Sequence, residues 1–447
     1  MSDTGAQTVA YVRDTMLPQQ EPPGTQVGAV KWLRENLFSS WFNTILTLVS
    51  IYLIYWVVMH LQHWFLGGIW NAGSLTECRE IRDAAAMAAN GGVLPEGGAR
   101  DVACFAVLTD RWQQLVYGFY PSEIYWRANL AAVLLLVAIS PVLFDKLPRK
   151  MLIFTALYPF VMFWLVWGGS VWLPIAAILG FFVGAIAYRL LAGAGSLAAI
   201  IGAIVAPVLW WLFAAGPFET AMESILPFTI QQVASKDIGG FMISLIIGFT
   251  GIALSLPLGI LLALGRQSDL LIVKSLCVGF IEFIRGVPLI TLLFTASLLL
   301  NYFLPPGTNF DIILRVIIMV TAFASAYMAE VIRGGLAALP TGQYEAADAL
   351  GLDYWQAQQL IIMPQALKIS IPGIVNTFIG LFKDTTLVVF IGIFDMLGFT
   401  NAIRASTDWN GIYWELFIFV GLVFWVCCFS MSRYSQWLER KLQTGHR

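Results

Sequence analysis

Charged side chains lie inside stretches of this sequence that are otherwise apolar, and Lys383 and Asp384 sit in the middle of one such stretch. Ionisable groups inside a membrane are costly and usually face a cavity or a partner. Adjacent positions on a helix point about 100° apart, so these two side chains cannot pair face to face. Two interpretations stay open. The two groups meet the opposite charges of a zwitterionic solute, or each group anchors a neighbouring helix through a structural ion pair.

A second set of charges lies near the ends of predicted helices. Glu330 and Arg333 are three residues apart on one helix face, a spacing that favours structural pairing or support of the loop that follows. Arg285 comes shortly before Pro288, which predicts a kink in the helix. Glu282, three residues before Arg285, is its expected ion-pair partner.

The residues of common catalytic and metal sites are missing. The sequence holds no Gly-x4-Gly-Lys-Ser/Thr stretch, so this chain cannot bind ATP phosphates through a P-loop. Ser-His-Asp chemistry is disfavoured because there are only 3 histidines and one lies at the extreme C-terminus. His60 and His63 have the spacing of a metal pair, but no further ligands accompany them. We therefore expect no catalytic residues and no metal site.

A polar stretch at 345–364 interrupts the hydrophobic C-terminal half. Local rules predict two short helices with a break between them. Thr341 is the predicted N-cap of the first helix, and Gly351 suits a left-handed position at its end. Asp353 has capping-box spacing for the second helix, which Pro364 is expected to terminate.

The composition is that of an integral membrane protein. The 447 residues are 59% hydrophobic and 12% charged, and the mean hydropathy is +0.77. Soluble globular domains carry about twice this charged fraction. A formal net charge of −2 without a basic run gives no indication of a nucleic-acid partner.

Apolar runs of about 20 residues have the length that crosses the hydrocarbon core of a bilayer, and they predict an all-α protein with about ten transmembrane helices. The predicted spans lie near residues 41–62, 127–144, 151–168, 171–190, 196–214, 239–264, 275–303, 312–335, 372–394 and 412–432.

Basic residues set the predicted orientation. With the N-terminus inside, most of the 25 Lys and Arg residues fall in cytoplasmic segments, as the positive-inside rule requires. Residues 1–40 then form a cytoplasmic tail, the C-terminus is cytoplasmic, and so is the loop at 340–364. A division near residue 238 separates aromatic-rich N-terminal helices (41–237) from a C-terminal core (238–447).

The long segment 67–126 falls on the outer side in this topology. Cys78 and Cys104 both lie in it, facing an oxidising compartment, and we expect them to form a disulfide rather than remain two free thiols.

The polar stretch resembles the EAA loop of ABC-importer permeases, Glu-Ala-Ala-x3-Gly-x9-Ile-x-Leu-Pro, with Met363 in place of the leucine. In that family the loop is the cytoplasmic coupling helix that docks on an ATPase subunit. The resemblance therefore assigns coupling to Glu345, Ala346, Ala347, Gly351, Leu352 and Pro364.

Further motifs resemble the polar-amino-acid permeases of this family over residues 235–440. They are the runs 283–289, with Val287 in place of a threonine, and 326–335. The following span contributes Asn376 and 383–387. The extra N-terminal helices make the chain similar to the larger membrane subunit of a general L-amino-acid importer. The resemblance implies these substrate-pathway candidates: Asn376, Lys383, Asp384, Thr385 and Thr386.

The resemblance also implies the membrane, the partner subunits and the cofactors with which the chain works. The last five helices would form the permease core of a type I ABC importer in the bacterial inner membrane, working by alternating access. Its partners would be a dimer of ABC ATPase subunits, a second and different permease chain, a periplasmic amino-acid-binding protein and the lipid bilayer. ATP and Mg²⁺ would bind in the ATPase partner, and this chain would bind no cofactor and catalyse nothing alone.

Two other classes of function remain possible from the sequence. An autonomous secondary transporter or channel would make the EAA match accidental, and a membrane scaffold would transport nothing. Dependence of uptake on ATP and on a binding protein separates the importer from both.

Overall fold

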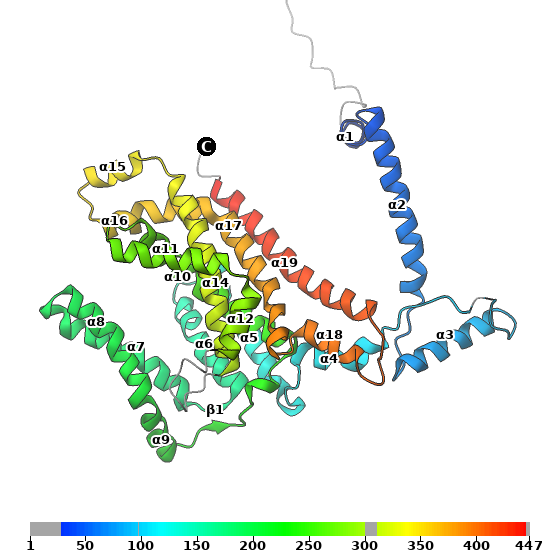
Figure 1. The fold of residues 1–447 in the computed structure, drawn as a ribbon, viewed down its shortest axis with the longest axis horizontal. Coiled ribbons are helices and arrows are strands. Elements are labelled where there is room, and N and C mark those ends of the chain that lie inside the picture. Colours follow the sequence, from blue (N-terminus) through cyan, green and yellow to red (C-terminus); the bar gives the residue numbers. More distant parts are fainter. Residues whose placement is uncertain (1–27, 97, 300–310, 444–447) are drawn as a thin grey trace, which may run out of the picture. The chain divides into compact units, whose positions relative to one another are not determined.

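The computed structural model describes residues 28–299 and 311–443, apart from Gly97 (Figure 1). Parts of three predicted segments lie outside the described residues: 1–27 of the tail, 300–303 of the seventh span, and 444–447 of the C-terminal core. The described chain is almost entirely helical, as the apolar runs predict.

The chain divides into two compact units, Met1–Ile69 with Arg82–Ala103 and Trp70–Ile81 with Cys104–Arg447. In the first unit α1 (Gly28–Asn36) precedes α2 (Trp41–Leu66), which is apolar on all faces and has no buried residue. A helix that is hydrophobic all round is typical of a membrane span. α3 (Leu75–Ala89) begins in the second unit and ends in the first.

The second unit begins with helices that precede residue 238. They are α4 (Ala106–Tyr117), η2 (Ser122–Ile124), α5 (Tyr125–Leu143), α6 (Met151–Trp167), α7 (Trp172–Leu191), η3 (Ala192–Ala194), α8 (Ser196–Leu209), the π-helical η4 (Trp210–Ala214) and α9 (Ala215–Ile225). The fifth predicted span thus continues eleven residues beyond its expected end at residue 214, to Ile225.

The predicted tight connection between the third and fourth spans is made by glycines. Gly168 and Gly169 have φ angles of +74° and +82°, which other residues rarely adopt. They lead into strand β1 (Gly169–Ser170), which pairs antiparallel with β2 (Thr229–Ile230).

The C-terminal helices of the second unit follow a short turn, η5 (Ser235–Asp237). They are α10 (Gly240–Gln267), α11 (Leu271–Gly286), α12 (Leu289–Leu298), α14 (Ile312–Ala337), α15 (Gly342–Ala349), α16 (Tyr354–Ala357), the π-helical η6 (Gln358–Ile362), α17 (Met363–Asp384), η7 (Thr385–Ile391), α18 (Met396–Arg404) and α19 (Trp414–Gln443).

α14 packs closely against both α10 and α17 because glycines lie at the crossings. A Cβ atom at Gly259 of α10 would lie 2.6 Å from the Met328 side chain. A Cβ at Gly335 of α14 would lie 2.6 Å from the carbonyl oxygen of Ala366 in α17. Any larger residue at these two positions would push the helices apart.

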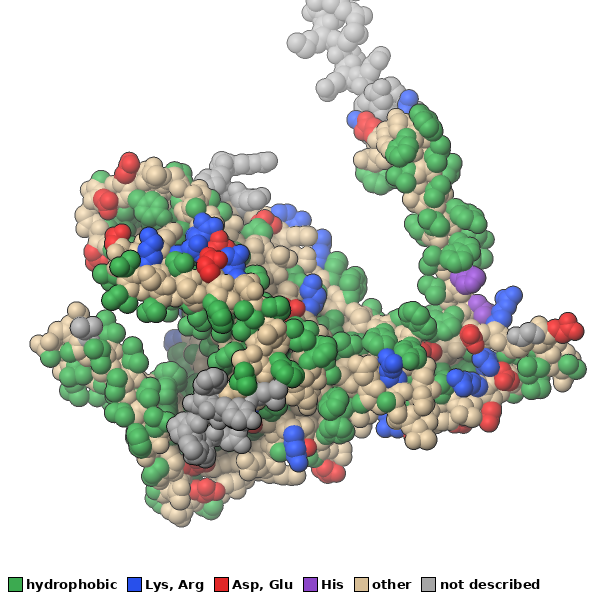
Figure 2. Space-filling view, in the orientation of Figure 1, with side chains coloured by type: hydrophobic (Ala, Val, Ile, Leu, Met, Phe, Trp, Pro, Cys, Tyr) green, Lys and Arg blue, Asp and Glu red, His purple; other side chains and the backbone are tan. Residues whose placement is uncertain are grey.

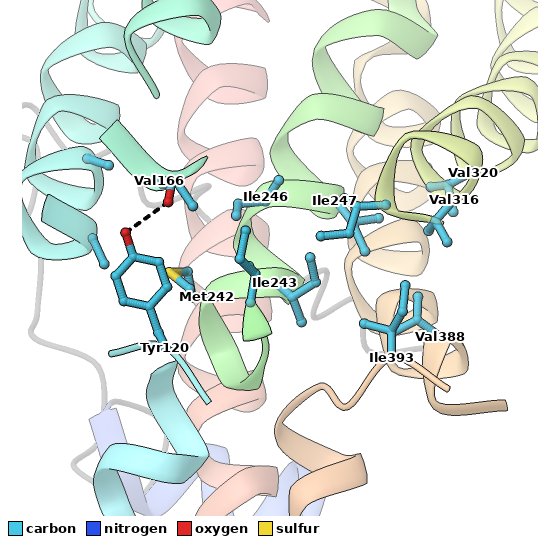
Figure 3. Close-up of a cluster of buried hydrophobic side chains, with 14 of the residues drawn as sticks. Tyr120, Val166, Met242, Ile243, Ile246, Ile247, Val316, Val320, Val388 and Ile393 are labelled. Atoms are coloured by element: carbon cyan, nitrogen blue, oxygen red, sulfur yellow. Dashed lines mark hydrogen bonds between the residues drawn. The ribbon is translucent and has the colours of Figure 1, made fainter. Parts of the chain in front are cut away.

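A cluster of buried aliphatic side chains fills the space beside these crossings (Figure 3). Ile243 and Ile247 of α10 face Val316 and Val320 of α14, and Val388 of η7 belongs to the same cluster. The same cluster includes Ala128 of α5 and Leu165 of α6, so the core of the second unit lies among α10, α14, η7 and the helices that precede residue 238.

Eight helices in the described residues are long and apolar enough to cross a membrane, and the bent pair α11–α12 makes nine if it counts as one span. α6, the third predicted span, has only 17 residues. The ten predicted spans are mainly helical where they are described, and the seventh is broken between α11 and α12; the number of ten crossings is not confirmed. Hydrophobic side chains cover much of the outer surface (Figure 2). The chain is an all-α, multi-pass membrane protein.

Candidate functional site

The polar stretch between α14 and α17 folds as a short helix, a turn and a second helix. Thr341 is the N-cap residue of α15, as predicted, but its side chain makes no capping hydrogen bond. Gly351 has φ +70°, the left-handed conformation predicted for the end of the first helix. Its turn is closed by the Leu352 N–H, which donates to the Ala347 carbonyl at 3.2 Å.

The second helix begins as predicted and does not end as predicted. Asp353 and Gln356 form a capping box, with hydrogen bonds of 2.9 and 3.2 Å. Pro364 lies in the first turn of α17, and the helix continues through it from Tyr354 to Ile391. The π-helical turn η6, just before α17, widens the helix where proline would otherwise clash with the preceding turn.

The turn between these helices exposes large apolar side chains that the motif did not identify. Leu350, Tyr354, Trp355 and Leu360 have exposed fractions of 72%, 54%, 65% and 65%. Ala347, within the motif, is instead fully buried against the protein, whereas Glu345 and Ala346 are exposed. Exposed apolar side chains grouped on a short polar segment are typical of a protein-docking surface.

Residues 340–364, which the sequence predicts to couple transport to an ATPase and which are here called the coupling segment, are attached to the membrane helices through α15. The Gln365 amide of α17 donates to the side-chain oxygen of Gln343 at 2.9 Å. Tyr344 packs against a buried cluster that includes Leu336 of α14 and Ile362. Burial raises the pKa of Tyr344 above its usual value, so the phenol stays neutral. α15 is therefore hydrogen-bonded to α17 and packed against α14.

Replacing Gly351 by valine should disrupt this turn and weaken binding of a partner on the segment. The position is open, with no atom near the added Cβ, so the penalty is the left-handed backbone, about 1–2 kcal/mol. Gly342→Val is the matched control, because Gly342 is also open and lacks a positive φ. Co-purification of the ATPase partner and ATP-driven uptake would be measured. Equal partner binding and uptake by both variants would contradict the role assigned to Gly351.

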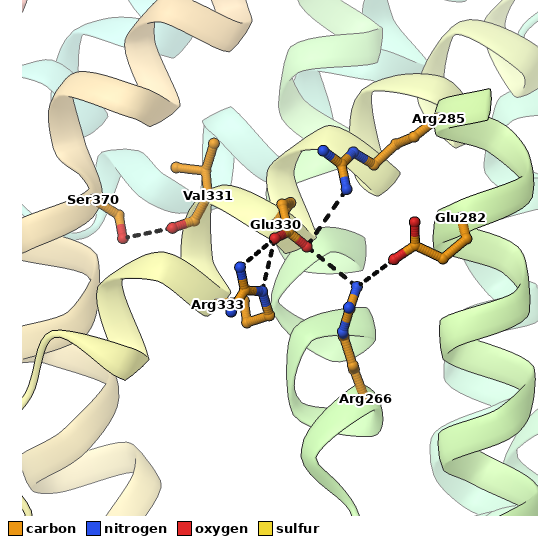
Figure 4. Close-up of polar contacts among 7 residues, drawn as sticks. All are labelled: Arg266, Glu282, Arg285, Glu330, Val331, Arg333 and Ser370. Atoms are coloured by element: carbon orange, nitrogen blue, oxygen red, sulfur yellow. Dashed lines mark hydrogen bonds and ion pairs between the residues drawn. The ribbon is translucent and has the colours of Figure 1, made fainter. Parts of the chain in front are cut away.

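Five charged residues form a network beside the coupling segment (Figure 4). Glu330 of α14 lies at its centre. It pairs with Arg333, as expected from their spacing, and with Arg266 at 3.2 Å and Arg285 at 3.6 Å. Glu282 binds Arg266 at 3.0 Å. The network joins α10, α11 and α14.

The expected pair between Glu282 and Arg285 is wrong, because the two side chains point to different partners. Arg285 turns toward Glu330 of α14 and also lies 5.6 Å from the centre of the Tyr327 ring. The kink predicted at Pro288 is present as a break of 101° between α11 and α12. α11 therefore lies across the bundle, where Glu282 reaches Arg266 of α10 and Arg285 reaches α14.

The substrate-pathway candidates lie on different faces of α17 and η7. Asn376 and Lys383 are both exposed and are two turns apart on one face, with the open glycine Gly380 between them. Asp384 is half-buried on the adjacent face, as the angle between successive residues predicts. Within a membrane span, an exposed lysine and asparagine require a polar cavity or a partner chain beside them.

The two threonines proposed for the pathway differ in exposure. Thr385 is 1% exposed, and its hydroxyl donates to the Phe382 carbonyl at 2.8 Å. Its methyl group faces the glycine Gly248 of α10, which places Thr385 in the helix contact and not on the exposed face. Thr386 is half-buried and donates to the Lys383 carbonyl at 2.9 Å.

A disulfide joins Cys78 and Cys104, whose Cα atoms are 6.1 Å apart, as expected from their shared segment.

The buried carboxylate of Asp395 was not predicted, although an acid before a short helix is a capping signal. It is 0% exposed and accepts hydrogen bonds from the N–H groups of Leu397 and Gly398 at 3.2 and 2.8 Å. Burial raises the pKa of Asp395 to about 6, against the opposing effect of these hydrogen bonds.

Among the described residues, no three His, Cys, Asp or Glu side chains are grouped in a way that could hold a metal ion. His60 and His63 lie on α2, in the first unit.

Comparison with known proteins identifies relatives over the whole chain. Residues 255–444 match the family described as binding-protein-dependent transport system inner membrane component. The glutamate/glutamine/aspartate/asparagine transport system permease protein BztC of Rhodobacter capsulatus is 58% identical over 450 residues, covering 100% of both chains. The inner membrane amino-acid ABC transporter permease protein YhdY of Escherichia coli is 38% identical over 93% of this chain and 94% of its own. A crystal structure of an amino acid ABC transporter with histidines is 30% identical over 45% of this chain and 92% of that one, with a TM-score of 0.41.

Proposed function

The chain belongs to the family of binding-protein-dependent transport system inner membrane components, and from this premise we propose that it is the permease of an ATP-driven amino-acid importer. The substrates proposed are glutamate, glutamine, aspartate and asparagine, the class named for the relative that is 58% identical. The observation that carries the proposal is the coupling segment. It exposes apolar side chains at the start of a helix that continues to Lys383.

The ATPase partner would dock on the turn between α15 and α16. Leu350, Tyr354 and Trp355 offer it an apolar contact, and the Gly351 turn fixes their positions. ATP and Mg²⁺ would bind in that partner, because this chain has no P-loop. This chain would then supply the path and receive the movement, without catalysing hydrolysis.

Movement would reach the path through one continuous helix. Tyr354 begins a 38-residue helical stretch that ends at Ile391, and Lys383 lies 29 positions after Tyr354, ~44 Å away at the rise of an α-helix. A tilt of α16 would therefore shift Lys383 and Asn376. In this proposal Lys383 attracts the substrate carboxylate, and a second, different permease chain covers the exposed face that holds both residues.

Contacts between loops support the proposed topology. The disulfide favours an oxidising, extracytoplasmic side for residues 78–104. The Leu75 N–H donates to the Asp408 carbonyl, so the connection between α18 and α19 lies on the same side. At the other end of α19, Lys441 pairs with Asp145 at 2.8 Å. Asp145 lies in the loop between α5 and α6, which the predicted topology assigns to the cytoplasm. Both termini and the coupling segment would then face the cytoplasm of a bacterial cell, with the chain in its inner membrane.

Reconstitution tests the proposal. The complex, purified with its partner subunits and placed in liposomes, should accumulate labelled glutamate only with ATP and the loaded binding protein. An ATPase partner that binds ATP without hydrolysing it provides the control, and it should give no accumulation. Accumulation driven by an ion gradient without ATP would show a secondary transporter instead, and downhill flux alone would show a channel.

A further inference from the structure

Two pieces of chain outside the family match pack against the core. Residues 70–81 and 104–120, here called the clamp, precede residue 255, where that match begins. Their ends are joined by the disulfide between Cys78 and Cys104, and the carbonyl of Trp70 accepts a hydrogen bond from the Thr109 hydroxyl at 3.2 Å. Both pieces belong to the same compact unit as α10 to α19.

The clamp binds the loop between α18 and α19, residues 405–413, through Trp409. This indole is 0% exposed, and its N–H donates to the Asp110 carboxylate at 2.8 Å. Arg111 pairs with Asp408 at 3.3 Å, and the Leu75 N–H donates to the Asp408 carbonyl at 2.8 Å. Asp408 and Trp409, at the centre of the loop, are thus both bonded to the clamp.

The clamp also holds the helices on either side of this loop. At the start of α19, the buried carboxylate of Glu415 accepts a hydrogen bond from the Cys104 N–H at 2.8 Å. On α18, the Phe399 ring meets Phe119 of the clamp edge-on, with centroids 5.0 Å apart. Cys104 therefore takes part both in the disulfide and, through its N–H group, in the hydrogen bond that anchors α19.

Glycines at the contact between the clamp and the start of α10 leave no room for the clamp to shift. A Cβ at Gly118 would lie 2.6 Å from the Cα of Gly239, and a Cβ at Gly240 would lie 2.6 Å from the Leu115 carbonyl oxygen. The Gly240 N–H donates in turn to the Phe394 carbonyl, just before Asp395. The clamp, the start of α10 and the start of α18 thus form one rigid junction.

We propose that the clamp sets the conformation of the α18–α19 loop so that the substrate-binding protein docks on it productively. The partner and its side of the membrane rest on the proposed function. The loop exposes Thr407, Asp408, Asn410 and Tyr413, with Asp408 55% and Tyr413 42% exposed, and these polar or amphipathic side chains suit a soluble protein. A loop ordered in advance avoids the loss of conformational freedom that binding would otherwise require.

Trp409→Phe tests the clamp, because phenylalanine keeps a buried aromatic ring and removes the N–H donor together with part of the indole volume. In the reconstituted complex, the glutamate-loaded binding protein should need about a threefold to tenfold higher concentration for half-maximal ATPase stimulation, since a hydrogen bond to a carboxylate is lost. ATPase activity without the binding protein should not change. Trp210→Phe is the matched control: its indole also donates at 2.8 Å, to the Ala176 carbonyl, far from the clamp in sequence. It should leave the half-maximal concentration unchanged.

A second arm avoids folding defects by acting on the assembled wild-type complex. Reduction of Cys78–Cys104 should raise the half-maximal concentration in the same direction, and a complex with both cysteines replaced by serine should no longer respond to reductant. Unchanged half-maximal concentrations after reduction and in Trp409→Phe would overturn the clamp proposal. A wild-type complex that the binding protein does not stimulate would instead contradict the proposed function.

Discussion

Replacement of Lys383 by methionine is expected to abolish amino-acid uptake and to leave the transporter complex assembled. Methionine keeps nearly the volume of the side chain and removes the charge. Lys383 is exposed on α17, and no ion pair in the described part of the chain involves it. Removal of the Lys383 charge therefore breaks none of these ion pairs, so the effect should fall on transport. Subunit yield on size exclusion and uptake of labelled glutamate would be measured together.

Lys368→Met is the matched control for this prediction. Lys368 lies on the same helix and is half-buried, fifteen positions before Lys383 and outside the proposed path. This variant should retain most of the uptake. Loss of assembly in Lys383→Met alone would indicate a structural ion pair with another subunit, and normal uptake of every amino acid would remove Lys383 from the pathway.

Replacement of Glu330 by glutamine is expected to destabilise the core on the order of 3 kcal/mol, the effect of breaking a partly buried ion pair. The side chain of Glu330 is 22% exposed and faces three arginines, so its loss leaves their charges facing one another with only Glu282 to offset them. The contact between α11 and α14 should loosen beside the coupling segment. The thermal unfolding midpoint of the purified complex should fall, and ATP hydrolysis should no longer drive uptake.

Glu282→Gln distinguishes the central position from charge in general. Glu282 is 54% exposed and contacts Arg266 alone in this network, so its replacement should cost less than about 1 kcal/mol. Similar losses of thermal stability in the two variants would show that the network acts only through its net charge and not through the bonds centred on Glu330.

The sequence by itself determined the features that depend on neighbouring residues. Apolar length marked the membrane helices, because a lipid core accepts only long hydrophobic segments whose backbone bonds are satisfied internally. Gly351 and Asp353 were interpretable in the same way, since a left-handed turn favours glycine and a helix start favours an acid. The break at Pro288 also follows from a local rule, although its angle of 101° does not.

Tertiary structure decided which side chains meet. Local spacing suggested Glu282 for Arg285, but the bend of α11 directs each toward another helix. Thr385 is removed from the exposed face because α10 approaches there through a glycine. Pro364 failed as a stop signal because the adjoining π-helical turn accommodates it. The clamp is the strongest case: Asp110 and Trp409 are 299 residues apart, and no periodicity or motif relates such positions, since only the packing of distant segments brings them together.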